Sequence, residues 1–595
     1  MMYSYIKTIT RKAYLIISLS LLLLACAQKK EEQLTSPNTL IEEYLISQLD
    51  SAIFYLKKVN NSVSLSTAQM NFINARISIK RAEPILSFTD QEHYKTLFQP
   101  NILKVVEEDA TDIKKIAPKG FQVLEEILFT DSIDWSGVAY QVDFLSNRLK
   151  LIQANTSLDY FKLHHFLWLL RDEFVRIATT GITGFDSPVL GQSLEESTVI
   201  YNEMKRLIVF YESAFKSEEL FNEWLIELEA SSKDLNANFD LFDRYKFIQT
   251  HTNRQFEMWI RTVKDWGVEF PFELAISNSA PSLFDSTTFN VGYFSDRVWA
   301  EITKEKINLG RRLFNDSQLS IDGSLSCSSC HQKEIGFTDG LTVSENQTRN
   351  SPTMTYAGFQ KAFFYDARTG NLEGQIVDVV NNQTEFHSSI ENLIETVKSD
   401  SNYINQFGKV YAAEPSDLSI RNAIAAYIRS LAPFNSRFDQ SISGKKETLT
   451  VEEVNGFNLF MGKAQCATCH FPPLFNGTVP PNFSETEMEL LGVPEKNVTS
   501  NAKIDDDLGR YNLFKTEERK YFFKTPTIRN VALTTPYMHN GVFETLVNVM
   551  DFYDLGGGAG IGINMEHQTL PAEPLNLTEE EEANIIAFMK TLTDQ

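Results

Sequence analysis

The sequence predicts a mainly α-helical protein in which an N-terminal helical bundle precedes two smaller domains. From about residue 35 to about residue 270, apolar residues such as Leu45, Leu49 and Ile53 recur every three or four positions, the period of one helix face. The same region holds few Gly or Pro residues and lacks the alternation typical of strands. Beyond residue 300 the pattern changes to short helices separated by long polar loops, and two C-x-x-C-H motifs lie there.

The domain boundaries follow from these changes in pattern. We expect a signal peptide over residues 1–25, a helical bundle domain over 26–276, a linker over 277–299, and two domains over 300–445 and 446–595. The linker is rich in Ser, Asn, Thr and Asp and shows no sustained period. The formal net charge of −23 argues against nucleic acid as a partner, because phosphate recognition needs clustered Lys and Arg. It suits a basic soluble partner.

The N-terminus has the pattern of a lipoprotein signal. Basic residues precede an apolar run, Ala13 to Leu24, which is too short to cross a bilayer as a helix. The run ends in Leu23-Leu24-Ala25-Cys26, which resembles a bacterial lipobox and makes Cys26 the expected lipidation site. A plain secretory signal with a chance Cys is the alternative. We expect an exported protein, lipid-anchored to a bacterial membrane and facing the periplasm or the cell surface, with no other membrane contact.

Cysteine usage indicates covalent haem attachment. The five cysteines are Cys26 and two C-x-x-C pairs, each followed directly by His, so none is left over for a disulfide. In this motif the thiols bind the haem vinyl groups and the adjacent His reaches the iron. Structural zinc is the alternative, but zinc motifs space their pairs by about 15–20 residues, whereas Cys330 and Cys466 lie 136 residues apart. We therefore expect two haem c groups in two class I cytochrome c-like domains, at Cys327, Cys330 and His331 and at Cys466, Cys469 and His470.

The remaining iron ligands are less well determined by the sequence. No His lies between His331 and His387, and Met354 is the only Met in that interval, so the first iron should be five-coordinate and open to peroxide. For the second iron, Met550 and Tyr553 lie three residues apart on one side of a predicted helix, and the residues alone leave both open.

A short motif lies inside the predicted bundle. Gly120-Phe121-Gln122-Val123-Leu124-Glu125 resembles the G-x-H-x-x-E motif of imelysin and EfeO-like periplasmic bundles. Gln122 replaces the His of that motif, so metal binding is not expected. Apart from this resemblance, Glu125 is expected to be a solvated helix residue.

Residues 300–595 resemble the di-haem cytochrome c peroxidase/MauG family in the order and spacing of many short stretches. These are Leu309-Gly310-Arg311-Arg312-Leu313-Phe314, Phe337-Thr338-Asp339-Gly340, Arg349-Asn350-Ser351-Pro352-Thr353, Phe364-Tyr365-Asp366-Ala367-Arg368, Phe523-Lys524-Thr525-Pro526 and Pro536-Tyr537-Met538-His539-Asn540-Gly541.

The resemblance implies a peroxidase that reduces hydrogen peroxide to water. Electrons from a small donor protein, a cytochrome c or a cupredoxin, would pass through the second, electron-transfer haem to the first, peroxidatic haem. Glu385 matches the family's distal acid/base and Gln375 its companion, and Tyr365 stands where an inter-haem Trp is usual. A carboxylate over the iron can move the proton that O–O cleavage requires.

The resemblance also assigns the second iron's ligand and a calcium site. Tyr553, fourteen residues after His539, falls at the family's distal ligand position, which is Met in many peroxidases and Tyr in MauG-type proteins. Asn350, with the carbonyl groups of Thr534 and Pro536, matches an interdomain Ca²⁺ site.

Two alternative functions stay open at this point. The first is a MauG-like oxidase that modifies a partner protein through ferryl haem. Tyr553 favours it, and so does the absence of the His that many peroxidases of the family carry in the loop after the first haem. The second is a non-catalytic di-haem electron carrier, against which Glu385 and Gln375 argue, since a carrier needs no distal acid.

Overall fold

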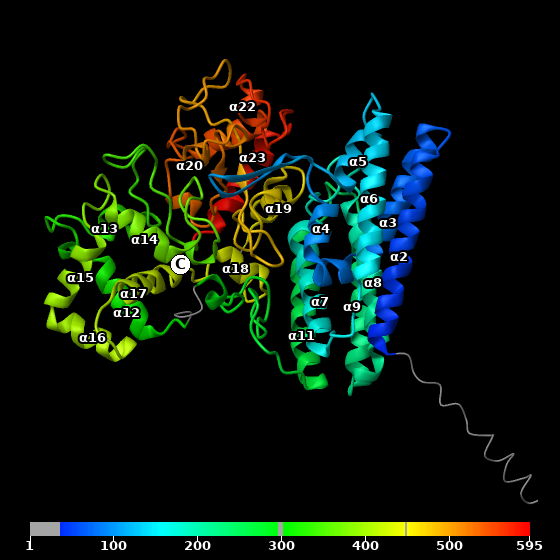
Figure 1. Cartoon of the computed structure of the whole chain (residues 1–595), viewed down its shortest axis with the longest axis horizontal. Coiled ribbons are helices and arrows are strands. Elements are labelled where there is room, and N and C mark those ends of the chain that lie inside the picture. The colour runs from blue at the N-terminus through cyan, green and yellow to red at the C-terminus, as the bar shows by residue number, and fades with distance from the viewer. Residues whose placement is uncertain (1–35, 296–300, 447–448) are drawn as a thin grey trace, which may run out of the picture.

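The computed structural model describes residues 36–295, 301–446 and 449–595, as a helical bundle beside two smaller helical domains (Figure 1). The mainly α-helical class predicted from the sequence is confirmed. The predicted signal peptide and Cys26 lie outside the described residues. Among the described helices, none is both long enough and apolar enough to cross a membrane.

The long helices of the bundle lie side by side (Figure 1). Helix α2 (Pro37–Asn60) is capped by Ser36, whose side chain accepts a hydrogen bond from the backbone N–H of Thr39. Helix α3 (Leu65–Thr89) is capped by Ser64 through the same kind of hydrogen bond and packs along α2. The other elements are α4 (Gln91–Leu97), β1 (Lys104–Asp109), β2 (Asp112–Ile116), α5 (Phe121–Leu128), α6 (Trp135–Asn155), α7 (Leu163–Arg176), the π-helical η1 (Ile177–Gly181), α8 (Ser193–Phe210), α9 (Glu218–Asp234), α10 (Arg244–Phe247), the π-helical η3 (Ile248–Thr252) and α11 (Asn253–Trp266).

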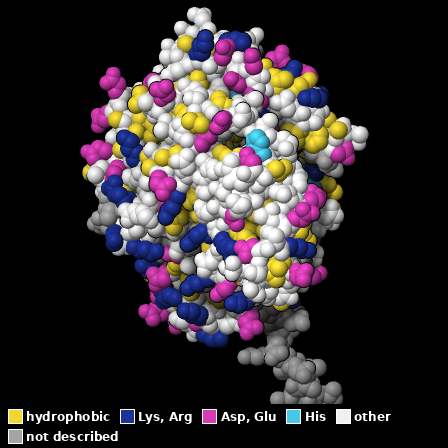
Figure 2. All heavy atoms as spheres, turned by 90° about the vertical axis from the view of Figure 1, so that its left-hand side faces the viewer, with side chains coloured by type: hydrophobic (Ala, Val, Ile, Leu, Met, Phe, Trp, Pro, Cys, Tyr) yellow, Lys and Arg dark blue, Asp and Glu magenta, His cyan; other side chains and the backbone are white. Residues whose placement is uncertain are grey.

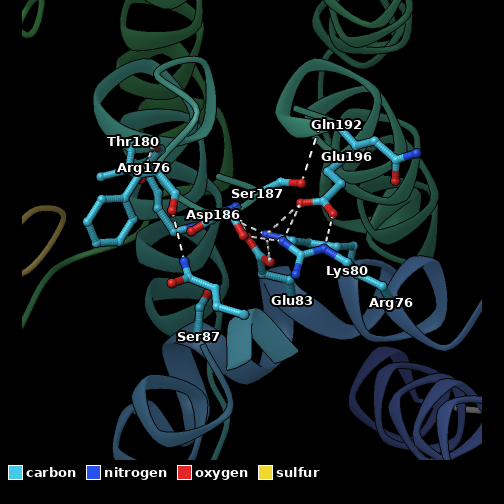
Figure 3. Close-up of polar contacts among 12 residues, drawn as sticks. Arg76, Lys80, Glu83, Ser87, Arg176, Thr180, Asp186, Ser187, Gln192 and Glu196 are labelled. Carbon is cyan, nitrogen blue, oxygen red and sulfur yellow. Dashed lines mark hydrogen bonds and ion pairs between the residues drawn. The ribbon is translucent and has the colours of Figure 1, made fainter. Parts of the chain in front are cut away.

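The centre of the bundle holds charged side chains that pair with one another (Figure 3). Lys80 Nζ lies 2.7 Å from Asp186 Oδ2 and 2.8 Å from Glu83 Oε2. Arg76 pairs with Glu196 and, at 3.0 Å, with Glu125. The expectation that Glu125 is solvated is wrong, because its side chain is 0% exposed. Buried charges persist where each has a counter-charge, as these do.

Strands β1 and β2 form an antiparallel hairpin that the sequence analysis did not predict. Lys104 pairs with Ile116, and Glu107 pairs with Ile113. The hairpin extends from the bundle toward the last domain, beside the loops that carry α20 (Tyr511–Phe514) (Figure 1).

The first of the two smaller domains is built around the crossing of α12 (Lys304–Phe314) and α17 (Asp417–Arg429). The helices approach closely at Gly310, where a Cβ atom would lie 1.8 Å from the carbonyl oxygen of Ala423. Only Gly allows this contact. The other helices are α13 (Cys327–Cys330), α14 (Leu372–Asn381), α15 (Ile390–Ser399), α16 (Ser401–Tyr411) and α18 (Arg437–Ile442).

The second smaller domain repeats this arrangement with α19 (Val451–Met461) and α23 (Glu579–Thr591). A Cβ atom on Gly456 would lie 1.9 Å from the carbonyl oxygen of Asn584. The two haem-motif domains thus share a helix crossing that depends on one glycine each. The remaining elements are β3 (Met488–Glu489), α20, β4 (Phe523–Lys524), α21 (Leu546–Asp554) and α22 (Gly557–Gly560).

The segment predicted as a linker packs against the domains it joins. Within its described part, Leu283 and Phe284 are 0% exposed. The Phe284 ring lies edge-on to Phe438 of α18, with 5.5 Å between centroids. The bundle also contacts the second smaller domain directly, where the rings of Phe185 and Phe471 meet at 5.9 Å. These contacts hold the bundle against the second haem motif.

The surface charge is mixed on the face formed by the first smaller domain (Figure 2). Lys and Arg side chains gather in the lower half of this view, while Asp and Glu side chains occur over the whole face. The net charge of −23 is therefore not concentrated there.

Candidate active site

The first C-x-x-C-H motif forms one helical turn, α13, which ends at His331. His331 Nδ1 donates a hydrogen bond to the carbonyl oxygen of Phe337 at 2.9 Å, which leaves Nε2 for a metal. Burial lowers the pKa of His331, so the ring is neutral near pH 7, the form that binds iron. The thiols of Cys327 and Cys330 are free. This donor set fits a covalently attached haem c.

The second motif has the same properties. Cys466 and Cys469 are free thiols on a short 3₁₀ turn, and His470 Nδ1 donates to the carbonyl oxygen of Pro526 at 3.0 Å. Burial lowers the pKa of His470 to about 4, which keeps this ring neutral as well. A cavity of about 260 Å³ opens beside the motif and is lined by both thiols and His470. The second donor set therefore also fits haem c.

Two side chains of α21 line the same cavity as His470 and could supply its second iron ligand. They are Met550 and Tyr553, one helical turn apart. Burial raises the pKa of Tyr553, so its phenol ionises near neutral pH only if a cation lies beside it. Both candidates from the sequence are thus present, and His539 lines the cavity too.

Glu385 acts electrostatically on both thiols of the first motif. It follows α14 in a turn, and Asn382 Nδ2 donates to Glu385 Oε2 at 3.2 Å. Burial and the nearby Glu385 carboxylate both raise the pKa of Cys327, to about 12. Burial raises the pKa of Glu385 above its usual value of 4.5. Gln375 lies on α14, ten residues before Glu385.

Tyr365 connects the two smaller domains. It belongs to the first of them, yet its side chain lines the cavity beside the second motif. Its backbone carbonyl accepts a hydrogen bond from the Lys524 N–H at 2.7 Å, and its hydroxyl donates to Asn350 Oδ1 at 3.3 Å. Burial raises the pKa of Tyr365, so the phenol is neutral at pH 7.

The residues predicted to bind calcium also meet at this cavity. Asn350, Thr534 and Pro536 all line it. The Asn350 N–H donates to the His539 carbonyl oxygen at 2.7 Å. His539 Nε2 lies 3.2 Å from Asp505 Oδ1. The first smaller domain therefore contacts the second one at Asn350, on the cavity that Thr534 and Pro536 also line.

The structure adds two cavity residues that the sequence analysis did not assign. Burial raises the pKa of Glu489 to about 7 and lowers that of Lys524 to about 8. Lys524 belongs to one of the stretches that carry the family resemblance, and this position could have indicated that Lys524 lies at the site. Glu489 lies outside those stretches, on the short strand β3.

Comparison with known proteins identifies the family. The model for "Di-haem cytochrome c peroxidase" matches residues 304–447. The cytochrome-c peroxidase IdrP1 of Denitromonas iodatirespirans is 32% identical over 314 residues, which cover 49% of this chain and 82% of that protein. The chain belongs to the di-haem cytochrome c peroxidase family. As a member of this family, the protein is an oxidoreductase. Membership of the family also implies two haem c groups, in agreement with the two donor sets.

Other similar proteins include MauG-type members of the di-haem cytochrome c peroxidase family. The methylamine utilization protein MauG of Methylorubrum extorquens is 29% identical over 300 residues, which cover 49% of this chain and 79% of that protein. A solved MauG-like protein associated with microbial copper homeostasis is 30% identical and aligns with 50% of this chain and 91% of its own, with a TM-score of 0.43. The family resemblance inferred from the sequence is confirmed.

Proposed function

We propose that the protein reduces hydrogen peroxide to water at the His331 site, with electrons that a small donor protein delivers to the His470 site. The half-buried carboxyl of Glu385, which acts electrostatically on the thiols of the first motif, carries this proposal. An electron carrier needs no such group, so the carrier alternative is disfavoured.

The side chains around the first motif have complementary tasks. When bound, the haem groups supply the iron and the path for electrons. Glu385 accepts a proton from peroxide and returns it to the departing oxygen, which leaves as water. Its raised pKa brings the carboxyl closer to the pH at which it must both take and give the proton. The hydrogen bond from Asn382 orients the carboxyl group.

The proposal is tested by mixing the two-haem protein with hydrogen peroxide and a reduced small c-type cytochrome. We expect rapid oxidation of the cytochrome, in proportion to the peroxide added. The absorbance of the cytochrome measures this oxidation. An oxidised form of the protein that persists while the cytochrome stays reduced would contradict the peroxidase function.

That contrary result would support a second candidate, a MauG-like oxidase that modifies a partner protein. Tyr553, which lines the cavity beside the second motif, favours this candidate, because Tyr at this position is the MauG-type residue in the resemblance. A covalent mass change in a partner protein after peroxide treatment would establish it.

Tyr553 is our proposed ligand of the second iron. Tyr553→Phe should alter the absorption spectrum of the second haem and raise its reduction potential, because an oxygen ligand favours ferric iron. Spectroelectrochemical titration measures both effects. Met550→Leu is the matched control on the same helix and should leave both nearly unchanged. If the Met550 variant instead loses a thioether-to-iron band, the assignment is reversed.

We also propose that Asn350 and the carbonyl groups of Thr534 and Pro536 bind Ca²⁺. Within the described residues, no group of three or more His, Cys, Asp or Glu side chains could hold a metal, so the ligands would be amide and carbonyl oxygens. Chelation should lower turnover, and added Ca²⁺ should restore it. Asn350→Ala should weaken Ca²⁺ binding in calorimetry. If the protein keeps full turnover after its calcium has been removed and this removal has been verified, the proposed site is excluded.

Finally, we propose that the protein is exported and anchored through a lipid on Cys26. Cys26→Ser should move the protein from the membrane fraction to the soluble fraction of cells, because the thioether-linked lipid cannot form. Immunoblotting of the two fractions measures the change. An unchanged distribution would favour another mode of membrane association.

A further inference from the structure

The β1–β2 hairpin of the bundle lies against the second smaller domain (Figure 1) and makes polar contacts with it. Glu107 Oε2 pairs with Arg510 Nε at 2.8 Å. The Val105 carbonyl oxygen accepts from Arg519 at 2.6 Å, and Lys115 pairs with Glu518 at 2.6 Å. The Glu107–Arg510 pair is the more enclosed of the two ion pairs, because the side chains of Glu107 and Arg510 are only 3% and 14% exposed. Salt screens such a pair weakly.

Arg510 also reaches the first smaller domain. Its Nη1 donates to the carbonyl oxygens of Asp366, at 3.1 Å, and Ala367, at 2.7 Å. These are the two residues that directly follow Tyr365. One guanidinium group thus joins the bundle hairpin, its own domain and the Tyr365 segment.

The Tyr365 segment has a backbone that needs external support. Phe364, directly before Tyr365, and Ala367, two residues after it, have φ angles of 61° and 55°. These angles lie in the left-handed region that residues with a Cβ rarely adopt. Such conformations persist only where surrounding contacts hold them. The bonds from Arg510 to the carbonyls of Asp366 and Ala367 are contacts of this kind.

Glu107 holds the Nε edge of the Arg510 guanidinium, whose plane also lies over the Phe514 ring, 5.1 Å from its centroid. Arg510 and Arg519 repel each other, and the carboxylate of Glu107 attracts both. With Nε held by Glu107, the Nη1 edge of Arg510 is directed at the two carbonyls. Without that charge, two adjacent guanidinium groups would lose a shared counter-charge, and Arg510 would turn away from the segment.

We infer that Glu107 of the N-terminal bundle is a positioning residue for electron transfer between the two haem sites. It acts through Arg510 on the segment that carries Tyr365. The inference rests on the proposed function, in which electrons pass from the His470 site to the His331 site. It gives the bundle a role in the reaction, since the bundle supplies one contact of the inter-haem junction.

The test compares variants of the full-length two-haem protein. The second haem is reduced with a stoichiometric amount of dithionite, because an iron with an oxygen ligand needs a strong reductant. The protein is then mixed with hydrogen peroxide, and reoxidation of the second haem is followed by stopped-flow absorbance. Glu107→Gln should slow this reoxidation by about tenfold to hundredfold, because small displacements far from the chemistry can have effects of this size. The initial reaction with peroxide and both resting haem spectra should stay unchanged. In steady state kcat should fall, while the KM for peroxide should not rise.

Lys115→Met is the matched control, since it removes the exposed hairpin contact to Glu518 and should transfer electrons at the wild-type rate. In Arg510→Lys, the lysine cannot bind Glu107 and both carbonyls at once, so this single variant should also slow electron transfer. The double variant with Glu107→Gln should be no slower than either single variant, because both changes break the same chain of contacts.

Two outcomes would overturn the inference. Wild-type transfer in Glu107→Gln, or equal slowing in Lys115→Met, would show that Glu107 has no specific part in positioning. If the wild-type protein itself shows no peroxide-driven reoxidation of the second haem, the proposed function fails, and this inference fails with it.

Discussion

Replacing Glu385 by Gln should lower peroxide turnover by about two to four orders of magnitude, the usual effect of removing a general acid/base. Gln keeps the size of the side chain and can still bond to Asn382, but it cannot accept and return a proton. Both haem groups should stay attached, because neither pair of attachment cysteines, Cys327/Cys330 or Cys466/Cys469, is changed. Steady-state oxidation of a reduced cytochrome, with haem content measured by absorbance, provides the comparison.

The pH dependence of the same variant is a second check. Glu385 must be ionised to accept a proton, so activity is present above its pKa and is lost as the pH falls through it. Because burial raises this pKa above 4.5, the acid limb of kcat/KM should lie above pH 4.5 and should vanish in Glu385→Gln. Glu391→Gln removes an exposed carboxyl on α15 and should keep full turnover. Near-normal turnover in the Glu385 variant would remove it from the mechanism.

The features that the sequence predicted well depend on local patterns. Helix periodicity and caps such as Ser36 operate within a few residues, so the helical class followed directly. The C-x-x-C-H motif requires one turn of chain, and the structure places Cys327–Cys330 on such a turn. Glu385 was assigned only through the family resemblance, because nothing local to its sequence distinguishes it from other loop carboxylates.

The features that the sequence did not predict depend on contacts between distant residues. Glu125 pairs with Arg76, which lies on a different helix, and a helical pattern cannot show that both charges are buried. Glu107 and Arg510 are 403 residues apart. The β1–β2 hairpin is short and half exposed, so its strands lack the apolar alternation by which strands are recognised. The predicted linker holds Phe284, whose burial depends on Phe438 of α18.

Asp439→Asn should lower the free energy of unfolding of the haem-bearing region by about 3–5 kcal/mol, the usual cost of removing one partner of a buried ion pair. Arg529 and Asp439 are 0% and 1% exposed and form two bonds, of 2.8 and 2.9 Å. Asn keeps the shape of the side chain but leaves the guanidinium without its charge partner. Guanidinium denaturation followed by haem absorbance measures the loss.

The size of the Asp439 effect depends on what else can neutralise Arg529. Asp594 also interacts with this guanidinium, and burial raises the pKa of the Asp594 carboxyl. If Asp439→Asn alone had little effect and only the double variant with Asp594→Asn unfolded readily, the prediction would be contradicted, and Asp594 would be the main counter-charge of Arg529. Asp400→Asn, at a partly exposed pair with Arg312, is the control and should change stability little, because solvent screens this pair. Since Arg529 Nε donates to the Pro473 carbonyl oxygen at 2.8 Å, three residues beyond His470, a destabilised Asp439 variant should also show a disturbed second haem.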